Sequence, residues 1–230
     1  MRKTGDPARF ENAQNRRILV FNAAPAADAP GGVIAALTGG EVISQRALLG
    51  RGASEMMVTL LQDVLNAAGW REKGPDAIAV VRGPGSFTGL RASLALAAGL
   101  AKGYECPLHG VSIGACYRAE TEMQQEVWTA TRARRNRIFL ERPDGTFWAG
   151  APDAANIPSG RLIVGDASSW LHDHLAMTHL FRSDMDQQPS PGAIAAAARH
   201  EPPVDRVTPL YVDPPEAKPP LAGLRPAPIP

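Results

Sequence analysis

The chain has 230 residues, with 24 Lys and Arg against 23 Asp and Glu, so its formal net charge is +1. That near-balance gives no overall attraction to nucleic acid or to an anionic membrane, and it excludes a binder that works by charge alone. A hydrophobic fraction of 44% is enough for a sizeable core, in one large domain or two small ones. Two cysteines, Cys106 and Cys116, are too few for a disulfide framework, so we expect free thiols in a reducing compartment.

The two ends of the chain differ from its middle. Residues 1–15 are polar, and we expect a loose extension there. The apolar run at 18–21 is too short for a signal-peptide core, and no stretch approaches the ~18 apolar residues of a membrane span. We therefore expect a cytoplasmic protein. Residues 214–230 carry seven prolines, which predict an extended, disordered tail.

The first half predicts three strands, followed by two helices that alternate with two further strands. Apolar residues recur every three or four positions from Met57 to Ala68, which indicates a helix that Ser54 can cap and Gly69 can end. Gly39 and Gly40 favour a hairpin turn. The other predicted elements are strands at 17–21, 32–37, 41–48, 77–81 and 108–111 and a helix at about 88–102, ended by Gly103.

The second half repeats this order in a weaker form. The predicted elements are a linking helix at 112–123, strands at 126–131, 136–141, 146–149 and 161–164, a turn at 143–145, and helices at 168–176 and 191–200. Three meandering strands followed by crossover helices are typical of an RNase H-like domain. We therefore predict an α/β protein with two RNase H-like halves, at 16–111 and 112–213. This is the plan of actin, Hsp70 and the sugar kinases, and the second half is smaller and degenerate.

The segment 82–91, Arg-Gly-Pro-Gly-Ser-Phe-Thr-Gly-Leu-Arg, lies between a predicted buried strand and a helix. Its glycines allow backbone angles that other residues avoid, and Ser86 or Thr88 can cap the helix. The free N–H groups of a helix start could bind an anion. A tight, well-capped turn explains the same residues without any ligand.

The segment lacks the residues of three catalytic loops. A P-loop needs a lysine, which is missing. A nucleophile elbow needs glycine two residues before and after its serine, but Ser86 is flanked by Pro84 and Thr88. A Rossmann loop needs a third glycine where Thr88 stands. We therefore expect no catalytic residue here.

With its flanks, this segment closely resembles the signature of the TsaB family, also called YeaZ. Residues 81–91 are preceded by Ala-Ile-Ala-Val and followed by Ala-Ser-Leu-Ala-Leu-Ala-Ala-Gly-Leu-Ala-Lys-Gly. Weaker matches extend the resemblance to roughly residues 17–216. Residues 53–69 look like the family's first helix, 131–140 like its DARRGEVY strand pair, and 162–166 and 209–212 like its later strand and closing segment.

The resemblance implies a part in making N6-threonylcarbamoyladenosine at position 37 of tRNAs that read codons beginning with A. In that family, TsaD transfers the threonylcarbamoyl group, TsaB is its non-catalytic partner, and the ATPase TsaE joins the pair. We therefore expect no cofactor on this chain itself, ATP and Mg on the partner subunits, tRNA as substrate of the complex, and no membrane contact.

The resemblance also implies an interface on the helices at 54–68 and 88–102, for TsaD or for a second copy of the chain. The candidate interface residues are Met56, Met57, Leu60, Leu61, Val64, Phe87, Leu90, Arg91 and Leu94. The candidate signature-loop residues are Gly83, Pro84, Gly85, Ser86, Thr88 and Gly89. From periodicity alone, a thick core would explain the same apolar residues.

The chain departs from the family after its first strand. The family has Asp-Thr-Ser there, the remnant of a phosphate-binding loop, whereas this chain has Asn22, Ala23 and Ala24. The histidine that usually leads the first helix is replaced by Ala53. An acid that could hold magnesium and two hydroxyls that could hold phosphate are thus missing. A scaffold tolerates these losses and an enzyme does not.

Two polar clusters remain. Arg132, Arg134, Arg135 and Arg137 form the densest basic stretch, but no aromatic residue interleaves them, which favours a solvated turn over tRNA contact. His172, His174 and His179 lack metal-ligand spacing, so we expect a solvated surface and no metal site.

Three other functions compete with the scaffold. A free-standing ATPase or kinase of the actin-like group is the alternative, and the missing Asp-Thr-Ser argues against it. Relatives of the family were once labelled glycoproteases, but no protease motif is present. A two-metal nuclease would need carboxylates on the strands, whereas the first strand ends in Asn22.

Overall fold

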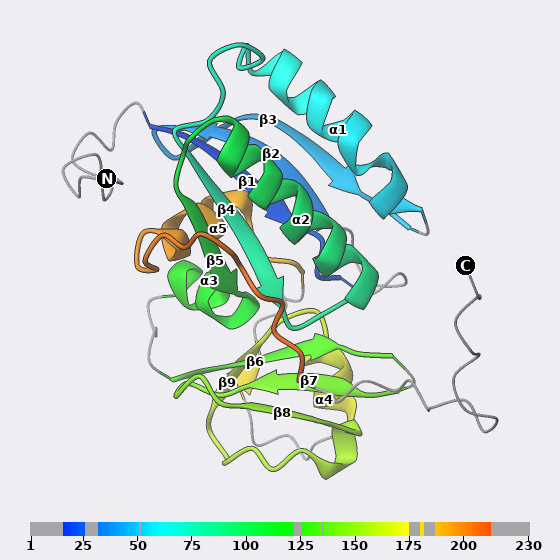
Figure 1. Ribbon diagram of the computed structural model, residues 1–230. Coiled ribbons are helices and arrows are strands. Elements are labelled where there is room, and N and C mark those ends of the chain that lie inside the picture. The colour runs from blue at the N-terminus through cyan, green and yellow to red at the C-terminus, as the bar shows by residue number, and fades with distance from the viewer. Residues whose placement is uncertain are drawn as a thin grey trace, which may run out of the picture.

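The computed structural model describes residues 16–25, 32–50, 52–121, 126–134, 136–174, 180–181 and 187–212. The predicted N-terminal extension and the proline-rich tail lie outside these residues. The described chain forms two five-stranded sheets, one above the other in Figure 1, with helices on their faces.

The first sheet has the strand order β3-β2-β1-β4-β5. β1 pairs antiparallel with β2, and β2 with β3, whereas β4 and β5 run parallel to β1. Gly39 and Gly40 join β2 to β3 with φ of 62° and 94°, as a tight hairpin turn requires. The strands are β1 Arg17–Asn22, β2 Gly32–Thr38, β3 Glu41–Leu48, β4 Ala77–Gly83 and β5 Leu108–Ser112.

The second sheet repeats this topology. Its order is β10-β9-β6-β7-β8, with β7 and β8 antiparallel to the central strand β6 on one side and β9 and β10 parallel to it on the other. Each strand of the second sheet therefore has a counterpart in the first, which confirms two RNase H-like halves. The strands are β6 Val127–Arg132, β7 Ile138–Glu141, β8 Phe147–Gly150, β9 Leu162–Val164 and β10 Leu180–Phe181.

The outer face of each sheet is covered by its own helices. α1, Ala53–Ala67, and α2, Phe87–Gly103, lie on the first sheet over an apolar layer that includes Phe21 and Leu61. α4, Ser168–His174, and the short 3-10 helix η3, Pro152–Ala154, cover the second. η3 lies between the third and fourth strands of its sheet, as α1 does in the first half. Because η3 has only 3 residues and α1 has 15, the second half is the smaller one.

The inner faces share one core. α3, Ile113–Glu120, and α5, Pro191–Ala198, pack on each other between the sheets (Figure 1). α3 contacts β6 of the second sheet and β4 and β5 of the first, whereas α5 contacts all five strands of the first sheet. Both helices thus pack on the first sheet, α3 also packs on the second, and one continuous apolar cluster joins both sheets.

Some helix ends differ from the sequence prediction: α3 ends at Glu120 and α5 at Ala198, where the sequence predicts 123 and 200. Ser54 does not cap α1, because Gly52 is the cap residue and takes φ 84°. α2 ends at Gly103, as predicted, and the bond from Cys106 N–H to the Ala101 carbonyl follows this end, with Glu105 at φ 52°. The described part of α4 ends at His174. Gly69, at φ 70°, follows α1 as predicted.

Candidate functional site

The signature loop leaves β4 at Gly83 and enters α2 through a cis peptide bond before Pro84. Ser86 is the helix cap, since its Oγ accepts a hydrogen bond from Gly89 N–H at 3.3 Å. Thr88, the other candidate cap, lies exposed in the first turn. Of the two serine and threonine candidates, only Ser86 therefore shapes the loop.

The loop is packed against the backbone that continues from β1. A Cβ on Gly85 would lie 2.1 Å from the carbonyl oxygen of Ala24, and one on Gly89 would lie 2.2 Å from that of Ala23. Ser86 N–H donates to the same Ala24 carbonyl at 2.7 Å. The space where an anion would approach these N–H groups is thus taken by protein carbonyls. This arrangement favours the well-capped turn over the anion site.

A buried polar chain joins the two halves beside this loop. Asn22, at the end of β1, accepts from Ala24 N–H at 3.1 Å and donates to Gln188 Oε1 at 3.0 Å. Gln188 in turn donates to Asp166 Oδ2 at 3.0 Å, and Asp166 accepts from Arg132 N–H at 2.8 Å. Both the amide nitrogen and the amide oxygen of Asn22 are thus engaged in hydrogen bonds within the chain. The family resemblance predicts the acid of a phosphate-binding loop at this position.

Five of the nine candidate interface residues are interior. Leu90 is 0% exposed, and the others that are buried with it in the chain's own core are Met57, Leu61, Val64 and Leu94. The periodic stripe in the sequence marks the faces of α1 and α2 that pack on the sheet, so these five side chains do not reach a partner. The sequence-based placement of the interface on them is wrong, and a glutamate at Leu90 would disrupt the core. The thick-core interpretation holds for these positions.

The outward side of the two helices also carries apolar residues. Met56 is 52% exposed on α1. Val58, which sequence reasoning missed, is 53% exposed but lies roughly 200° around the helix from Met56 and is not part of this surface. On α2, Phe87, Arg91, Ala95 and Gly99 form one exposed row at a spacing of four residues. Leu60, Leu96 and Leu100 are partly buried beside them. We call these exposed and partly buried residues the helix face.

The signal for the helix face was available in the sequence. Residues 92–101 contain no charged side chain. A helix with one face against a sheet normally carries charged residues on its other face. In α2 the exposed charged residues are Arg91 near the start and Lys102 near the end, and the uncharged stretch between them predicts that this part of the row is covered by something else.

An aromatic and cationic cluster borders the helix face. The guanidinium carbon of Arg91 lies 3.8 Å from the ring centre of Phe87, and Arg91 Nε donates to the hydroxyl of Tyr211 at 2.8 Å. The rings of Phe87 and Tyr211 stack with centres 5.4 Å apart. Tyr211 belongs to the family-like closing segment, so the two motifs meet in space.

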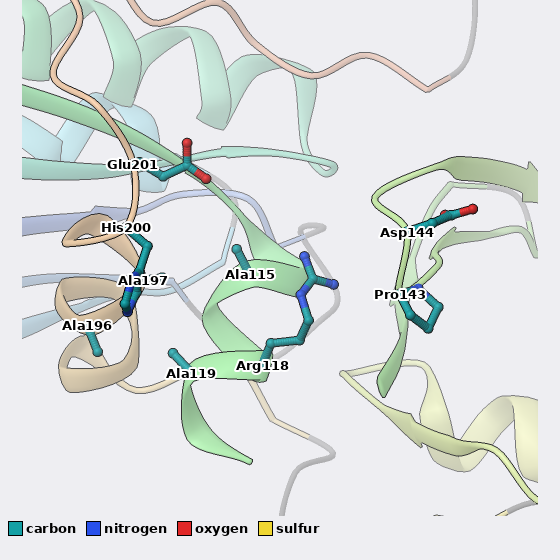
Figure 2. Close-up of a pocket in the computed structure, with 9 residues that line it drawn as sticks. All are labelled: Ala115, Arg118, Ala119, Pro143, Asp144, Ala196, Ala197, His200 and Glu201. Atoms are coloured by element: carbon teal, nitrogen blue, oxygen red, sulfur yellow. The ribbon is translucent and has the colours of Figure 1, made fainter. Parts of the chain in front are cut away.

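The structure has a hollow of about 870 Å³ between α3, α5 and the turn from β7 to β8 (Figure 2). Arg118 on its wall is paired with Glu141 at 2.8 Å, and Glu141 also accepts from Ser112 Oγ and Gly114 N–H. Its other lining residues are Ala115, Ala119, Pro143, Asp144, Ala196, Ala197, His200 and Glu201. None of the sequence-predicted site residues lines this hollow.

Neither cysteine thiol is activated as a nucleophile. Burial raises the pKa of the Cys106 thiol to about 11 and that of Cys116 well above its ordinary value, so neither is a thiolate at neutral pH. Within the described residues, no three His, Cys, Asp or Glu side chains are grouped to hold a metal ion. No helix there is long and apolar enough to cross a membrane.

Comparison with known proteins places these features in a family. The family model of TsaD, tRNA N6-adenosine threonylcarbamoyltransferase, matches residues 42–151. An uncharacterised protein of Mycobacterium bovis is 32% identical over 148 residues, 63% of this chain and 67% of that one. The tRNA threonylcarbamoyladenosine biosynthesis protein TsaB of Escherichia coli is 33% identical over 111 residues, 48% of this chain and 46% of that one. The chain belongs to the TsaB/YeaZ family.

Solved YeaZ-like structures share the fold. A Pseudomonas aeruginosa protein described as similar to the peptidase YeaZ superposes with a TM-score of 0.67 over 86% of this chain and 100% of that one, at 20% identity. YeaZ from the same organism gives 0.65 over 85% and 99%. The chain matches about half the length of the TsaB proteins of E. coli and Haemophilus influenzae.

Proposed function

We propose that this chain is a non-catalytic subunit that pairs with a TsaD-like transferase in making N6-threonylcarbamoyladenosine at position 37 of tRNAs that read codons beginning with A. Its membership of the TsaB/YeaZ family supports the pathway. The observation that carries the proposal is the exposed row of α2 beside the signature loop, in which Arg91 is the one charged residue. Such a surface suits a protein partner.

The scaffold role is supported by the backbone just after β1. Asn22 is engaged with Ala24 and Gln188, and the carbonyls of Ala23 and Ala24 pack on the loop glycines. An actin-like ATPase or kinase, the alternative function, needs an acid and free donors at this position. We therefore propose that ATP and magnesium are bound by the transferase and by a TsaE-like ATPase, in the cytoplasm, and not by this chain.

A peptidase role has less support. Ser86 is the serine of the signature loop, and its hydroxyl accepts the capping bond from Gly89 N–H. This is a structural role, like that of any helix cap.

The test of the proposal is the mass of the complex, measured by size-exclusion chromatography with light scattering, for this chain alone and mixed with the TsaD of its host. We expect a stable assembly that contains both chains. Ala95→Glu introduces a charge at the middle of the exposed row and should weaken pairing by roughly 2–3 kcal/mol, some 30- to 150-fold in Kd.

Ala154→Glu is the matched control, since Ala154 is an exposed helical alanine in the second half. It should pair like the parent chain. If Ala95→Glu and Ala154→Glu bind TsaD with equal affinity, the helix face is not the interface. Absence of any complex would overturn the scaffold role, and tight binding of Mg-ATP by the chain alone, measured by calorimetry, would favour the ATPase. A homodimer in the absence of TsaD that Ala95→Glu dissolves would mean that the same face also pairs two copies.

A further inference from the structure

A second hollow, of about 550 Å³, lies at the carboxyl end of β6. It is formed by the turn from β6 to β7 on one side and the first turns of α4 on the other. Its lining is polar except for one indole and one methyl group: Arg132, Ala133, Arg134, Asn136, Ser169, Trp170 and Asp173. The fold thus places an aromatic side chain beside the arginine stretch, which the sequence shows without any interleaved aromatic residue.

The two halves differ at one helical position beside the hollow. Leu90 and Leu171 are both fully buried, and their N–H groups donate to the Ser86 and Ala167 carbonyls at 2.9 Å. They therefore occupy equivalent positions in α2 and α4. The residue before Leu90 is Gly89, against which the Ala23 carbonyl packs, whereas the residue before Leu171 is Trp170. The indole excludes such close packing and leaves an open space beside it.

The lining groups are held in place. Arg132 Nε donates to the Asp166 carbonyl at 2.8 Å, which fixes its guanidinium at the edge of the hollow. Trp170 is partly buried against the apolar cluster of the second sheet, so its ring does not collapse into the space. Arg134 and Ser169 are exposed. The result is a fixed ring with exposed cationic and hydroxyl groups around it.

These groups match the parts of a nucleotide. Guanidinium groups bind phosphate through charge-assisted bonds, and an indole face stacks on any base. Asn136, Ser169 and Asp173 supply donors and acceptors for a base edge or a ribose 2′-hydroxyl. The carboxylate of Asp173 disfavours a second anionic group at its own end, so the phosphate belongs at the arginine end. The volume lies within the range of small-molecule pockets.

We propose that this hollow binds one nucleotide of an RNA chain, with its base on Trp170 and its phosphate on Arg132 and Arg134. The inference deepens the proposed function, because it places the substrate class of that complex on this subunit. It uses none of the helix face, so RNA and the protein partner would occupy different surfaces.

The test measures the anisotropy of a short fluorescein-labelled single-stranded RNA titrated with the full chain over a series of salt concentrations. Trp170→Leu keeps apolar contact with the core but removes the stacking face, and should weaken binding about fivefold or more. Arg134→Gln, at an exposed position, should lower the slope of log K against log salt by about 0.7. Arg71→Gln makes the same change at an exposed position in the first half and should leave affinity and slope unchanged.

Unchanged RNA binding in both Arg134→Gln and Trp170→Leu would overturn the proposal. If AMP or UMP binds as tightly as the RNA and responds to the variants in the same way, the ligand of the hollow is a free nucleotide and the proposal of an RNA strand is overturned. The measurement needs no partner, so its failure is distinguishable from failure of the proposed pairing, which chromatography measures without RNA.

Discussion

Single glycines decide where the signature loop lies. At Gly85 and Gly89 the carbonyls of Ala24 and Ala23 approach so closely that a methyl group would overlap them. Gly99, in the same helix as Gly89, has no neighbour within 4 Å of an added Cβ. Glycines that look alike in the sequence therefore have opposite roles, one set for close backbone contact and the other on an open surface.

Gly85→Ala should lower the free energy of unfolding by roughly 2–4 kcal/mol, because the backbone of Ala24 must move away from the loop. Gly99→Ala should raise it by roughly 0.5–1 kcal/mol, since alanine is the better helix former and meets no atom there. Urea unfolding of the two variants measures both effects. Equal stability of Gly85→Ala and the parent chain would contradict the close packing of the loop on Ala24.

At the scale of elements, α2 is held at its start by a segment from the far end of the described chain. Leu210 N–H donates to the Arg82 carbonyl at 2.7 Å, next to the Arg91 and Tyr211 contact. Val207 contacts the cluster under α1 and α2, so the segment lies along the first half (Figure 1). The position of the helix face thus depends on residues far away in sequence.

Tyr211→Ala removes both the ring stacked on Phe87 and the acceptor for Arg91. We expect hydrogen exchange at the Leu210 amide to become about tenfold faster, since local opening of the segment loses a charge-assisted hydrogen bond. Val212→Ala, one residue on, should leave exchange at Leu210 unchanged. If Tyr211→Ala and Val212→Ala exchange alike at Leu210, the cluster does not hold this segment.

At the scale of the molecule, two features make one body of the two halves. α3 and α5 contact each other, and α5 packs on the first sheet although it comes after the second in sequence. The polar chain from Asn22 through Gln188 to Asp166 joins the ends of β1 and β9. Since Asp166 is only 2% exposed, its carboxylate depends on the partners it has in this chain.

Gln188→Glu replaces the donor to Asp166 with a second carboxylate. We expect a loss of roughly 1–3 kcal/mol in unfolding free energy at neutral pH, because the bond is replaced by repulsion between two carboxylates. Gln187→Glu makes the same change on the neighbouring residue, whose side chain is exposed, and should be nearly neutral. Denaturant unfolding measures the unfolding free energy of both variants. An equal loss in Gln188→Glu and Gln187→Glu would contradict the bridging role of Gln188.

Local patterns in the sequence are enough for the order of the strands and helices other than η3 and β10, which the sequence does not predict, and for the two-half plan, the hairpin at Gly39 and Gly40, and the family. These features depend on local periodicity, turn residues and a contiguous motif, all of which involve residues that are close together in the sequence. The sequence by itself does not separate the inward from the outward residues of α1 and α2, because the same apolar stripe serves a core or an interface. Only packing on the sheet decides that Leu90 points inward while Ala95 points out.

Which residues distant in sequence come into contact depends on the tertiary structure. Trp170 comes to lie beside Arg132 and Arg134 because β6 and β9 are neighbours in the sheet and place the β6–β7 turn next to the start of α4. Tyr211 reaches Arg91 for a similar reason, since the closing segment returns along β4. Such contacts are formed by strand register and helix packing across the whole chain, which no local pattern of residues records.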